Sequence, residues 1–544
     1  MGMRWVLTRK AGQTAKARLV VLGFQAHNLC EVETSSPTMS KLGRNCVLAI
    51  AAAMGFIVKS GDVTSAFLQT GISLEDENLH VLAPPELSAI FGAQHGEQLV
   101  LKVREAFYGC AHAPRKWFEK CVNTMSKLNW KQLKGDRYIF ALYETDKDGH
   151  QILVGIAGIH VDDYLIAGSP TPKLFQDMEK ELYNTFRWGK WEDSAFGFAG
   201  CLVKQLPDGS IMLAQEDYVL KWIEEIPIDK TKSKKALLDT SEIAQLRGAL
   251  GTSSWRATQT GPQFLAETSL LLSEINVATI DTLYRVNRLM REASQGLLFP
   301  CWRKSIKDLA VIIYADASQH NRLDRSSTIG IITLLGPREV LQGEECQLAV
   351  LQWKSGKTPR QCLGSNGAEV QSITIGKGQN YQIRMLLAEI SGEDINRSSL
   401  YDVVKRIPGA LVMDSRGIYD AMTRNMSALH GLRESRGGYE LVLAVNSARR
   451  AETMLRWVNG MSQLGDGLTK NNARKMLLQF FSQKQYWRLV DDPKFEAGRK
   501  VHKRELEKKI NEMQALVVQK VKELAAKENL PWDEGPVVTY HHLT

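Results

Sequence analysis

The chain has 544 residues, of which 44% are hydrophobic and 24% charged, a composition typical of a folded globular protein and long enough for two to four domains. Eight cysteines with no CxxC pair exclude a disulfide scaffold and a cysteine-rich zinc site, and they indicate a reducing compartment. The net charge of +9 suits a polyanionic partner, although ordinary surface lysine would give the same excess. No secretory signal is visible, and the apolar run 47–58 is too short to span a bilayer, so we expect neither secretion nor membrane insertion.

A first carboxylate stands just after this apolar run. The spacing predicts a short strand over 56–59, with Asp62 placed where the chain turns.

The segment 152–168 places two adjacent acids between two apolar runs of strand length. Each run is bounded by glycine, which predicts a β-hairpin with Asp162 and Asp163 at its tip. Two like charges at the end of an apolar hairpin repel each other and are costly to desolvate, and a divalent cation removes that cost. Together with Asp62, they could share two Mg²⁺ ions. The alternative is an ordinary solvated turn.

The chain then alternates short strands and helices before a longer helical region. The predicted elements are a helix over 175–186, a hairpin formed by 196–203 and 209–213, a helix over 215–223, a polar linker at 229–235, and helices from 240 to about 298.

Four further acids stand at the ends of predicted elements in the third region of the chain. These elements are a strand over 309–318 with Asp316, strands over 326–335 and 350–354, a helix from 365 with Glu369, a strand over 410–416 with Asp414, a strand over 455–458, and a helix start within 462–470 with Asp466. Oxygen ligands from several elements meeting at one sheet edge are what a pair of Mg²⁺ ions requires. Each acid taken alone could merely cap a helix or lie in a turn.

The order of these motifs resembles the reverse transcriptase and ribonuclease H of copia-type LTR retrotransposon Pol polyproteins. The segments that carry the resemblance are 3–10 with 16–24, 34–37, 62–67, 106–117, the His160-Val-Asp-Asp163 box, and the four-acid region from 309 to 470. The family's box opens with Tyr where this chain has His160, so metal binding should survive while positioning of the primer end could be weaker. The resemblance also implies that the chain begins inside the family's first domain.

The resemblance implies an α+β and α/β multidomain fold, in which a right-hand polymerase with fingers, palm and thumb is followed by a ribonuclease H-like mixed-sheet domain. The expected boundaries are fingers and palm over 1–230, a helical thumb or connection over 231–305, the ribonuclease H-like domain over 306–475, and a basic helical tail over 476–544.

The implied activity is DNA synthesis on RNA and DNA templates, coupled to cleavage of RNA in hybrids. The seven acids are expected to hold two Mg²⁺ or Mn²⁺ ions in each of two sites. The expected partners are an RNA template, a DNA primer, an RNA–DNA hybrid and dNTPs, and the expected location is the cytoplasm, in a virus-like particle, or the nucleus. The alternative is a decayed or repurposed retroelement product that binds nucleic acid without catalysis.

Five residues are expected to support the polymerase site. Lys16 and Arg18 could hold the incoming triphosphate or form a solvated basic hairpin. Phe67 falls where the family places an aromatic gate below the sugar, although a plain core phenylalanine is an equal alternative. Gly109 would allow a close backbone approach to the nucleotide or template, and Pro114 would stiffen a turn.

A charged amphipathic helix is expected at the C-terminus, over 494–527. Its basic residues are concentrated between Arg499 and Lys509. They could add sequence-independent affinity for the template duplex, or the helix could simply be solvated.

Overall fold

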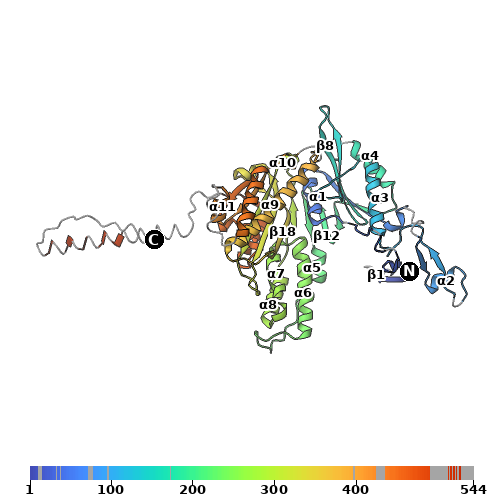
Figure 1. Cartoon of the computed structure of the whole chain (residues 1–544), viewed down its shortest axis with the longest axis horizontal. Coiled ribbons are helices and arrows are strands. Elements are labelled where there is room, and N and C mark those ends of the chain that lie inside the picture. The colour runs from blue at the N-terminus through green and yellow to red at the C-terminus, as the bar shows by residue number, and fades with distance from the viewer. Residues whose placement is uncertain are drawn as a thin grey trace. The chain divides into compact units, whose positions relative to one another are not determined.

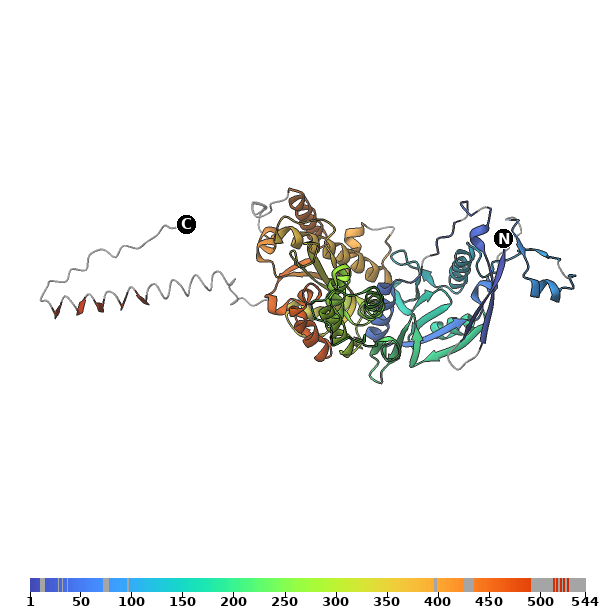
Figure 2. The same ribbon diagram turned by 90° about the horizontal axis from the view of Figure 1, so that it is seen from below.

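In the computed structural model the chain forms two compact units, Met1–Val490 and Asp491–Thr544. The described residues are 1–9, 15–27, 29–31, 33–36, 38–71, 78–94, 97–171, 173–395, 399–423, 435–490 and part of 512–527. The first unit is a mixed α/β structure (Figures 1 and 2). The domain boundaries expected at residues 230 and 305 lie inside this unit and stay predictions.

Two small antiparallel sheets open the chain. One pairs β1 (Met3–Arg9) with β2 (Ala15–Val21), and the other pairs β4 (His80–Leu82) with β5 (Val100–Lys102). Helix α2 (Pro85–Ile90) begins three residues after β4. The backbone ties the two sheets together at the N-terminus, because Leu82 N donates to Met1 O and Leu22 N donates to Gly2 O, both at 2.8 Å.

A six-stranded antiparallel sheet carries the first group of acids. Its strands, in spatial order, are β10 (Trp188–Asp193), β3 (Ile57–Val63), β9 (Asp163–Gly168), β8 (Gln151–His160), β7 (Ile139–Thr145) and β6 (Lys131–Gln132). The predicted hairpin with both acids at its tip is confirmed by β8 and β9. The prediction for Asp62 was wrong in one respect: β3 continues to Val63, so Asp62 lies inside the strand, because pairing with β9 extends to this residue.

Three helices pack against this sheet. They are α1 (Lys41–Met54), α3 (Ala113–Lys127) and α4 (Lys173–Tyr183), the last of which confirms the helix predicted over 175–186. Helix α1 begins where the Ser40 side chain accepts from Gly43 N, and it ends at Gly55, whose φ of 70° suits a residue without a side chain.

A four-stranded sheet and a helical lobe follow. The strands are β11 (Ala195–Phe198), β12 (Cys201–Gln205), β13 (Ile211–Ala214) and β14 (Leu297–Phe299), and the helices are α5 (Glu216–Trp222), α6 (Thr240–Gln259), α7 (Leu265–Ser273) and α8 (Ile280–Arg291). Helices α6, α7 and α8 lie beside one another (Figure 1). The helical region ends earlier than the predicted residue 298, because β14 leaves it to pair with β13.

The second large sheet is mixed. In spatial order its strands are β18 (Ala349–Lys357), β16 (Thr328–Pro337), β15 (Leu309–Ser318), β19 (Gly409–Met413) and β20 (Met454–Trp457). Strand β16 runs antiparallel to both of its neighbours, β18 and β15, whereas β15, β19 and β20 are parallel to one another. The accompanying helices are α9 (Ser365–Ile390), α10 (Leu400–Lys405), α11 (Arg416–Thr423) and α12 (Ser435–Arg450).

The edge strand β18 packs against the first half of the unit. Asn45 Nδ2 on α1 donates to Leu351 O at 2.8 Å, and Trp353 Nε1 donates to Ala257 O on α6 at 2.8 Å. Asn45 is fully buried and Trp353 nearly so. Buried hydrogen bonds of this kind are expensive to break, so the two large sheets are joined by a specific contact rather than by a linker alone.

The first unit ends later than the boundary expected at residue 475. Helix α13 (Lys475–Ser482) buries Leu477, Phe480 and Phe481, and β21 (Tyr486–Arg488) pairs with β17 (Glu345–Gln347), so these residues belong to the unit and not to a tail. In the second unit the described residues, which lie between 512 and 527, are helical and exposed. The basic group between Arg499 and Lys509 lies outside the described residues.

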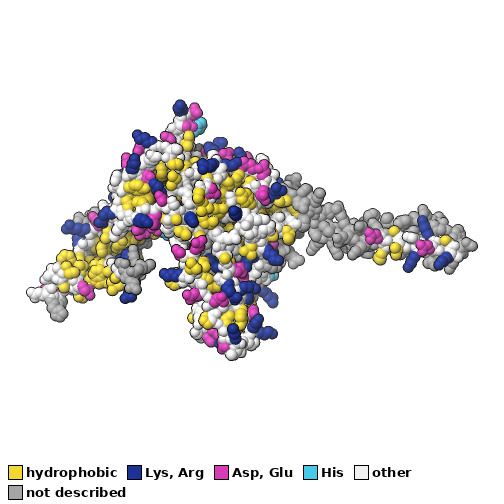
Figure 3. All heavy atoms as spheres, turned by 180° about the vertical axis from the view of Figure 1, so that it is seen from behind, with side chains coloured by type: hydrophobic (Ala, Val, Ile, Leu, Met, Phe, Trp, Pro, Cys, Tyr) yellow, Lys and Arg dark blue, Asp and Glu magenta, His cyan; other side chains and the backbone are white. Residues whose placement is uncertain are grey.

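None of the eight cysteines, all of which lie in the described part of the chain, forms a disulfide bond. On the face seen in Figure 3, acidic and basic side chains are interspersed rather than separated into areas of one sign. None of the helices in the described part of the chain combines the length and apolar character that crossing a membrane demands.

Candidate functional site

Three carboxylates meet on adjacent strands of the six-stranded sheet. Asp62 on β3 lies directly opposite Asp163 on β9, and Asp162 occupies the turn between β8 and β9. Oxygen atoms of the three side chains all lie within 4.8 Å of one another. The grouping predicted from the sequence is therefore present in the structure.

The hairpin tip is held in a strained conformation. Val161 has a φ of 60°, which a β-branched residue adopts at a cost of roughly 1–3 kcal/mol. Both carbonyls of the turn accept hydrogen bonds that oppose this strain, one from Trp117 Nε1 to Val161 O at 2.6 Å and one from Val63 N to Asp162 O at 2.9 Å. Trp117 is buried in the core, and it also fixes the turn that presents Asp162.

The three acids perturb one another. Burial, and then the charges of Asp162 and Asp62, raise the pKa of Asp163 to about 6. Three carboxylates this close together repel one another unless a proton or a cation compensates their charge. Carboxylate oxygens are hard ligands, which suit Mg²⁺. The donor set therefore fits a divalent metal.

A pocket lined by two of the three acids also contains two cations. Its volume is about 470 Å³, and it is lined by Lys16, Ala17, Arg18, Leu19, Asp62, Val63, Thr64, Ser65, Leu68, Phe107, Tyr108 and Asp162. The Arg18 guanidinium lies 5.5 Å from the centre of the Tyr108 ring, a cation–π contact that orients it. The hairpin β1–β2 thus brings Lys16 and Arg18 beside two of the acids, and their binding of a triphosphate stays a prediction.

Phe67 lies next to this pocket without lining it. Its ring meets Tyr108 edge to face at 5.4 Å, and it borders a smaller cavity of about 160 Å³ together with Trp117 and Val161. It is partly buried and packs against both hydrophobic cores. The gate and core interpretations of Phe67 therefore both stay open.

Gly109 and Pro114 have clear structural roles. Gly109 has a φ of 90°, and a Cβ at this position would lie 2.0 Å from Val21 O, so the close backbone approach is to strand β2. Pro114 stands in the first turn of α3, and its carbonyl accepts from Ser36 Oγ at 3.0 Å. Direct contact of either residue with a nucleotide or template stays a prediction.

His160, which replaces the family's tyrosine, lies opposite Asp163 across β8 and β9. It is half-buried, and its ring meets Phe198 edge to face at 6.3 Å. Burial is the main cause that lowers the pKa of His160, so the imidazole is neutral at pH 7 and adds no charge to the three acids.

A second group of acids lies on the mixed sheet. Tyr314 of β15 is opposite Val412 of the parallel strand β19, so Asp316 and Asp414, each two residues further on, reach the same edge. Glu369 on α9 completes the group, and oxygen atoms of the three side chains lie within 4.8 Å of one another. Three of the four predicted acids are thus brought together.

The fourth acid, Asp466, lies beside this group. It raises the pKa of Asp316 and Asp414, whose own burial is the larger cause. Lys470 Nζ forms an ion pair with Asp466 at 2.6 Å, and Thr469 Oγ1 donates to Asp316 Oδ2 at 2.7 Å. Sequence reasoning missed both roles, although the two residues follow Asp466 within four positions.

The buried acids of the second group are better suited to bind a cation than to be solvated by water. Glu369 and Asp316 are 9% and 2% exposed, and burial raises the pKa of both well above the usual range. Within the described residues, Glu369 Oε2 is buried and accepts no hydrogen bond. A buried carboxylate oxygen that lacks a donor is destabilising unless a metal or proton satisfies it.

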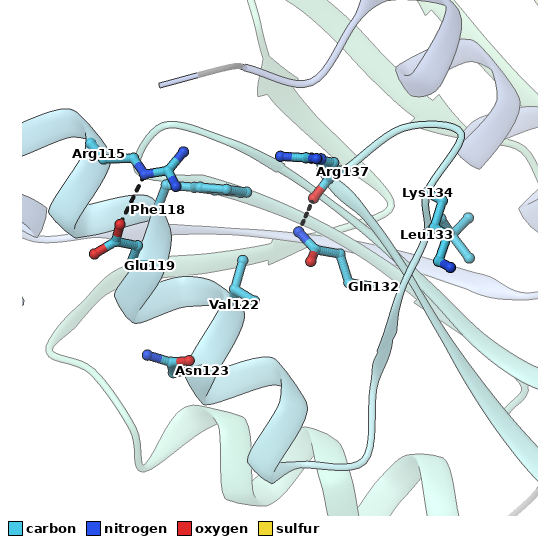
Figure 4. A pocket seen from close by; sticks show the side chains of 9 residues that line it. All are labelled: Arg115, Phe118, Glu119, Val122, Asn123, Gln132, Leu133, Lys134 and Arg137. Carbon is cyan, nitrogen blue, oxygen red and sulfur yellow. Dashed lines mark hydrogen bonds and ion pairs between the residues drawn. The ribbon is translucent and has the colours of Figure 1, made fainter. Parts of the chain in front are cut away.

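Two other polar sites, a pocket beside α3 and the turn between β7 and β8, are explained by contacts within the protein. A pocket of about 600 Å³ on the outer side of α3 includes Arg115 and Arg137, which reach toward the Phe118 ring from opposite sides (Figure 4). Arg115 donates to Glu119 at 2.9 Å, so this arginine is already engaged by a carboxylate.

The group Asp146, Asp148 and His150 lies on the turn between β7 and β8. Asp146 Oδ1 accepts from the backbone N–H groups of Asp148 and His150 at 2.9 and 2.7 Å. This carboxylate therefore closes the turn, and the group is explained without a metal.

Comparison with known proteins agrees with the geometry. Residues 1–238 match the family model described as reverse transcriptase (RNA-dependent DNA polymerase). The chain is 25% identical over 409 residues to the retrovirus-related Pol polyprotein from transposon RE1 of Arabidopsis thaliana, covering 72% of this chain and 26% of that protein. It is 28% identical over 294 residues to a putative transposon Ty5-1 protein of Saccharomyces cerevisiae, covering 50% of this chain and 88% of that protein.

The resemblance to retrotransposon Pol polyproteins is thereby confirmed as a similarity of this chain, and its first 238 residues match the reverse transcriptase family model. The ribonuclease H part of the resemblance stays a prediction. The chain spans about a quarter of the length of the Arabidopsis relative. Among solved structures, the foamy viral protease-reverse transcriptase in complex with RNA/DNA hybrid aligns over 89% of this chain and 74% of that chain, with a TM-score of 0.31 and 10% identity, values too low to support an argument.

Proposed function

We propose that this protein is an RNA- and DNA-directed DNA polymerase with ribonuclease H activity, which copies retrotransposon RNA into DNA. The observation that supports the proposal best is that two separate sheets each gather three carboxylates within 4.8 Å. Two acids of the first group line a pocket together with Lys16 and Arg18. Two cations beside these acids suit a reaction that binds a nucleoside triphosphate.

Asp62, Asp162 and Asp163 would hold Mg²⁺ or Mn²⁺ in the polymerase site, and Asp316, Glu369, Asp414 and Asp466 would hold it in the ribonuclease H site. When bound, such ions activate the attacking oxygen and stabilise the leaving oxygen of a phosphoryl transfer.

In the polymerase site, Lys16 and Arg18 would bind the triphosphate, whose charge they offset. The Tyr108 ring supports Arg18 and limits the orientations that its guanidinium can adopt. Trp117 keeps the turn at Val161 in place, which positions Asp162 at the same pocket. The expected partners are therefore dNTPs and a primer on an RNA or DNA template.

In the ribonuclease H site, the protein's contribution is orientation and charge. Thr469 fixes one oxygen of Asp316, and Lys470 neutralises part of the charge of Asp466. Because Asp316 and Glu369 are buried, their carboxylates would be held in place before a metal binds.

Two substitutions in parallel test the proposal. Primer extension on poly(rA)·oligo(dT) with Mg²⁺ or Mn²⁺ measures synthesis, and cutting of a labelled RNA–DNA hybrid measures cleavage. Asp163→Asn should abolish synthesis and leave cleavage intact, whereas Glu369→Gln should do the reverse, because each change removes one ligand with little change in volume. The exposed turn residue Asp148 provides a matched control, since Asp148→Asn should change neither activity.

Unchanged extension by Asp163→Asn would remove this residue from the polymerase site, and unchanged cleavage by Glu369→Gln would remove Glu369 from the second site. A wild-type protein that binds the hybrid but performs neither reaction would instead support a repurposed, non-catalytic binder.

A further inference from the structure

A buried carboxylate joins the two large sheets. Glu389, at the C-terminal end of α9, is 2% exposed. Its Oε1 accepts from Lys134 N at 2.8 Å, and its Oε2 accepts from Gly135 N at 3.0 Å. Lys134 and Gly135 lie in the loop between β6 and β7, in the first sheet, so both oxygens of one side chain are bonded to backbone of the other half of the unit.

The same contact is reinforced from β7. Tyr143 Oη donates to Glu389 O at 2.9 Å and to Ile390 O at 3.0 Å. Burial, and then the charge of Glu389, raise the pKa of Tyr143, so its hydroxyl remains a donor at neutral pH. A side chain at Gly135 would meet Leu386 Cδ1 at 3.0 Å, which shows how closely the loop and α9 approach.

The loop leads directly to the polymerase acids. Ile159 N, near the end of β8, donates to Tyr138 O at 3.0 Å, and Ile139 pairs with Gly158. Ile159 stands two residues before the strained Val161. Part of the loop also lines the pocket of Figure 4, on the side facing α3.

At its other end, α9 carries an acid of the second group. Glu369 precedes Glu389 by 20 residues on one continuous helix, a separation of about 30 Å at 1.5 Å per residue. The helix is fixed along its length, since Asn380 Nδ2 donates to Ala410 O at 3.2 Å and Arg384 Nε donates to Ile407 O at 2.6 Å. Displacement of one helix end relative to the other is therefore disfavoured.

We propose that Glu389 is a positioning residue that holds the loop 133–138 against α9 and thereby fixes the distance between the two carboxylate groups. On a hybrid that occupies both sites, this distance sets how far behind the primer terminus the RNA is cut. The inference rests on the proposed pair of activities and goes beyond it, because Glu389 belongs to neither group of acids.

Glu389→Gln is the most direct test. A glutamine keeps the volume but offers only one acceptor oxygen, so its NH₂ group faces one of the two backbone donors. The matched control is Glu393→Gln, because Glu393 follows the same helix but pairs with Lys307 at 3.1 Å. Tyr143→Phe removes the other hydrogen bonds of the contact and should act in the same direction as Glu389→Gln.

Two measurements are made on the full chain. Hydrogen exchange at the amides of Lys134 and Gly135 should be at least about tenfold faster in Glu389→Gln, the factor expected when a hydrogen bond to a charged group is lost. On a primed RNA template, the positions of RNA cuts relative to the primer terminus should spread, while the rates of extension and of cutting stay within about twofold of wild type. The Asn45–Leu351 contact remains in the variant and keeps the unit together.

The results of the two measurements distinguish a positioning role of Glu389 from a purely stabilising one. Exchange and cut positions like those of Glu393→Gln would overturn the inference. Faster exchange with unchanged cut positions would show a stabilising contact with no positioning role, and would also overturn it. A wild-type protein with neither activity would refute the proposed function instead, and faster exchange at both the loop and the segment 159–163 would then still support the mechanical link.

Discussion

Removing one charge from the group Asp62, Asp162 and Asp163 should stabilise the metal-free protein. The pKa of Asp163 is raised to about 6 in the folded state, against about 3.9 for an aspartate in an unfolded chain. The folded protein therefore binds more protons than the unfolded chain between these values, and its stability falls as the pH rises from about 4 to about 6. Asp163→Asn removes this penalty, so the variant should be more stable than wild type at pH 7.5.

The stability gained by Asp163→Asn can be worked out from the change in the pKa of Asp163 on folding. Two pKa units correspond to about 3 kcal/mol for a fully buried group. Asp163 is partly exposed, and solvent screening reduces the expected gain to about 1–2 kcal/mol. The gain should be small at pH 4.5 and complete above pH 7.

Urea unfolding at pH 4.5 and 7.5, with and without Mg²⁺, measures the effect. The exposed Glu224 gives the control Glu224→Gln, which should change little at either pH. Mg²⁺ should stabilise wild type more than Asp163→Asn, because a ligand that binds only the folded state adds to its stability. A variant less stable than wild type at pH 7.5, or a gain of equal size at both pH values, would refute the reasoning.

Three further substitutions probe the surroundings of these acids. Gly109→Ala should lower the free energy of unfolding by about 3 kcal/mol or more, because its φ is 90° and the new Cβ would lie 2.0 Å from Val21 O; unchanged urea unfolding would contradict this. Trp117→Phe should cost about 1–3 kcal/mol and slow primer extension but not RNA cleavage, since Val161 O loses its buried donor; equal extension rates would argue against a role for this bond. Phe67→Ala should raise ribonucleotide incorporation relative to dNTP incorporation in competition assays, and an unaltered ratio would leave Phe67 as a core residue.

The sequence by itself determined the elements that present the acids. The hairpin with Asp162 and Asp163, the strands ending near Asp316 and Asp414, and the helix with Glu369 all follow from local apolar patterns bounded by glycine or polar residues. Such patterns depend on neighbours within one element, so they can be recognised without a fold. Their collinear order then carried the resemblance to retrotransposon Pol polyproteins.

Only the tertiary structure decided what supports these acids. Trp117 reaches Val161, Gly109 makes room for Val21, and Glu389 binds the backbone of Lys134 and Gly135. Each of these contacts joins residues far apart in the chain, and in each one the partner is a backbone atom. A backbone N–H or carbonyl is the same at every position, so no sequence pattern marks it, and the contact exists only once the two segments have folded against each other.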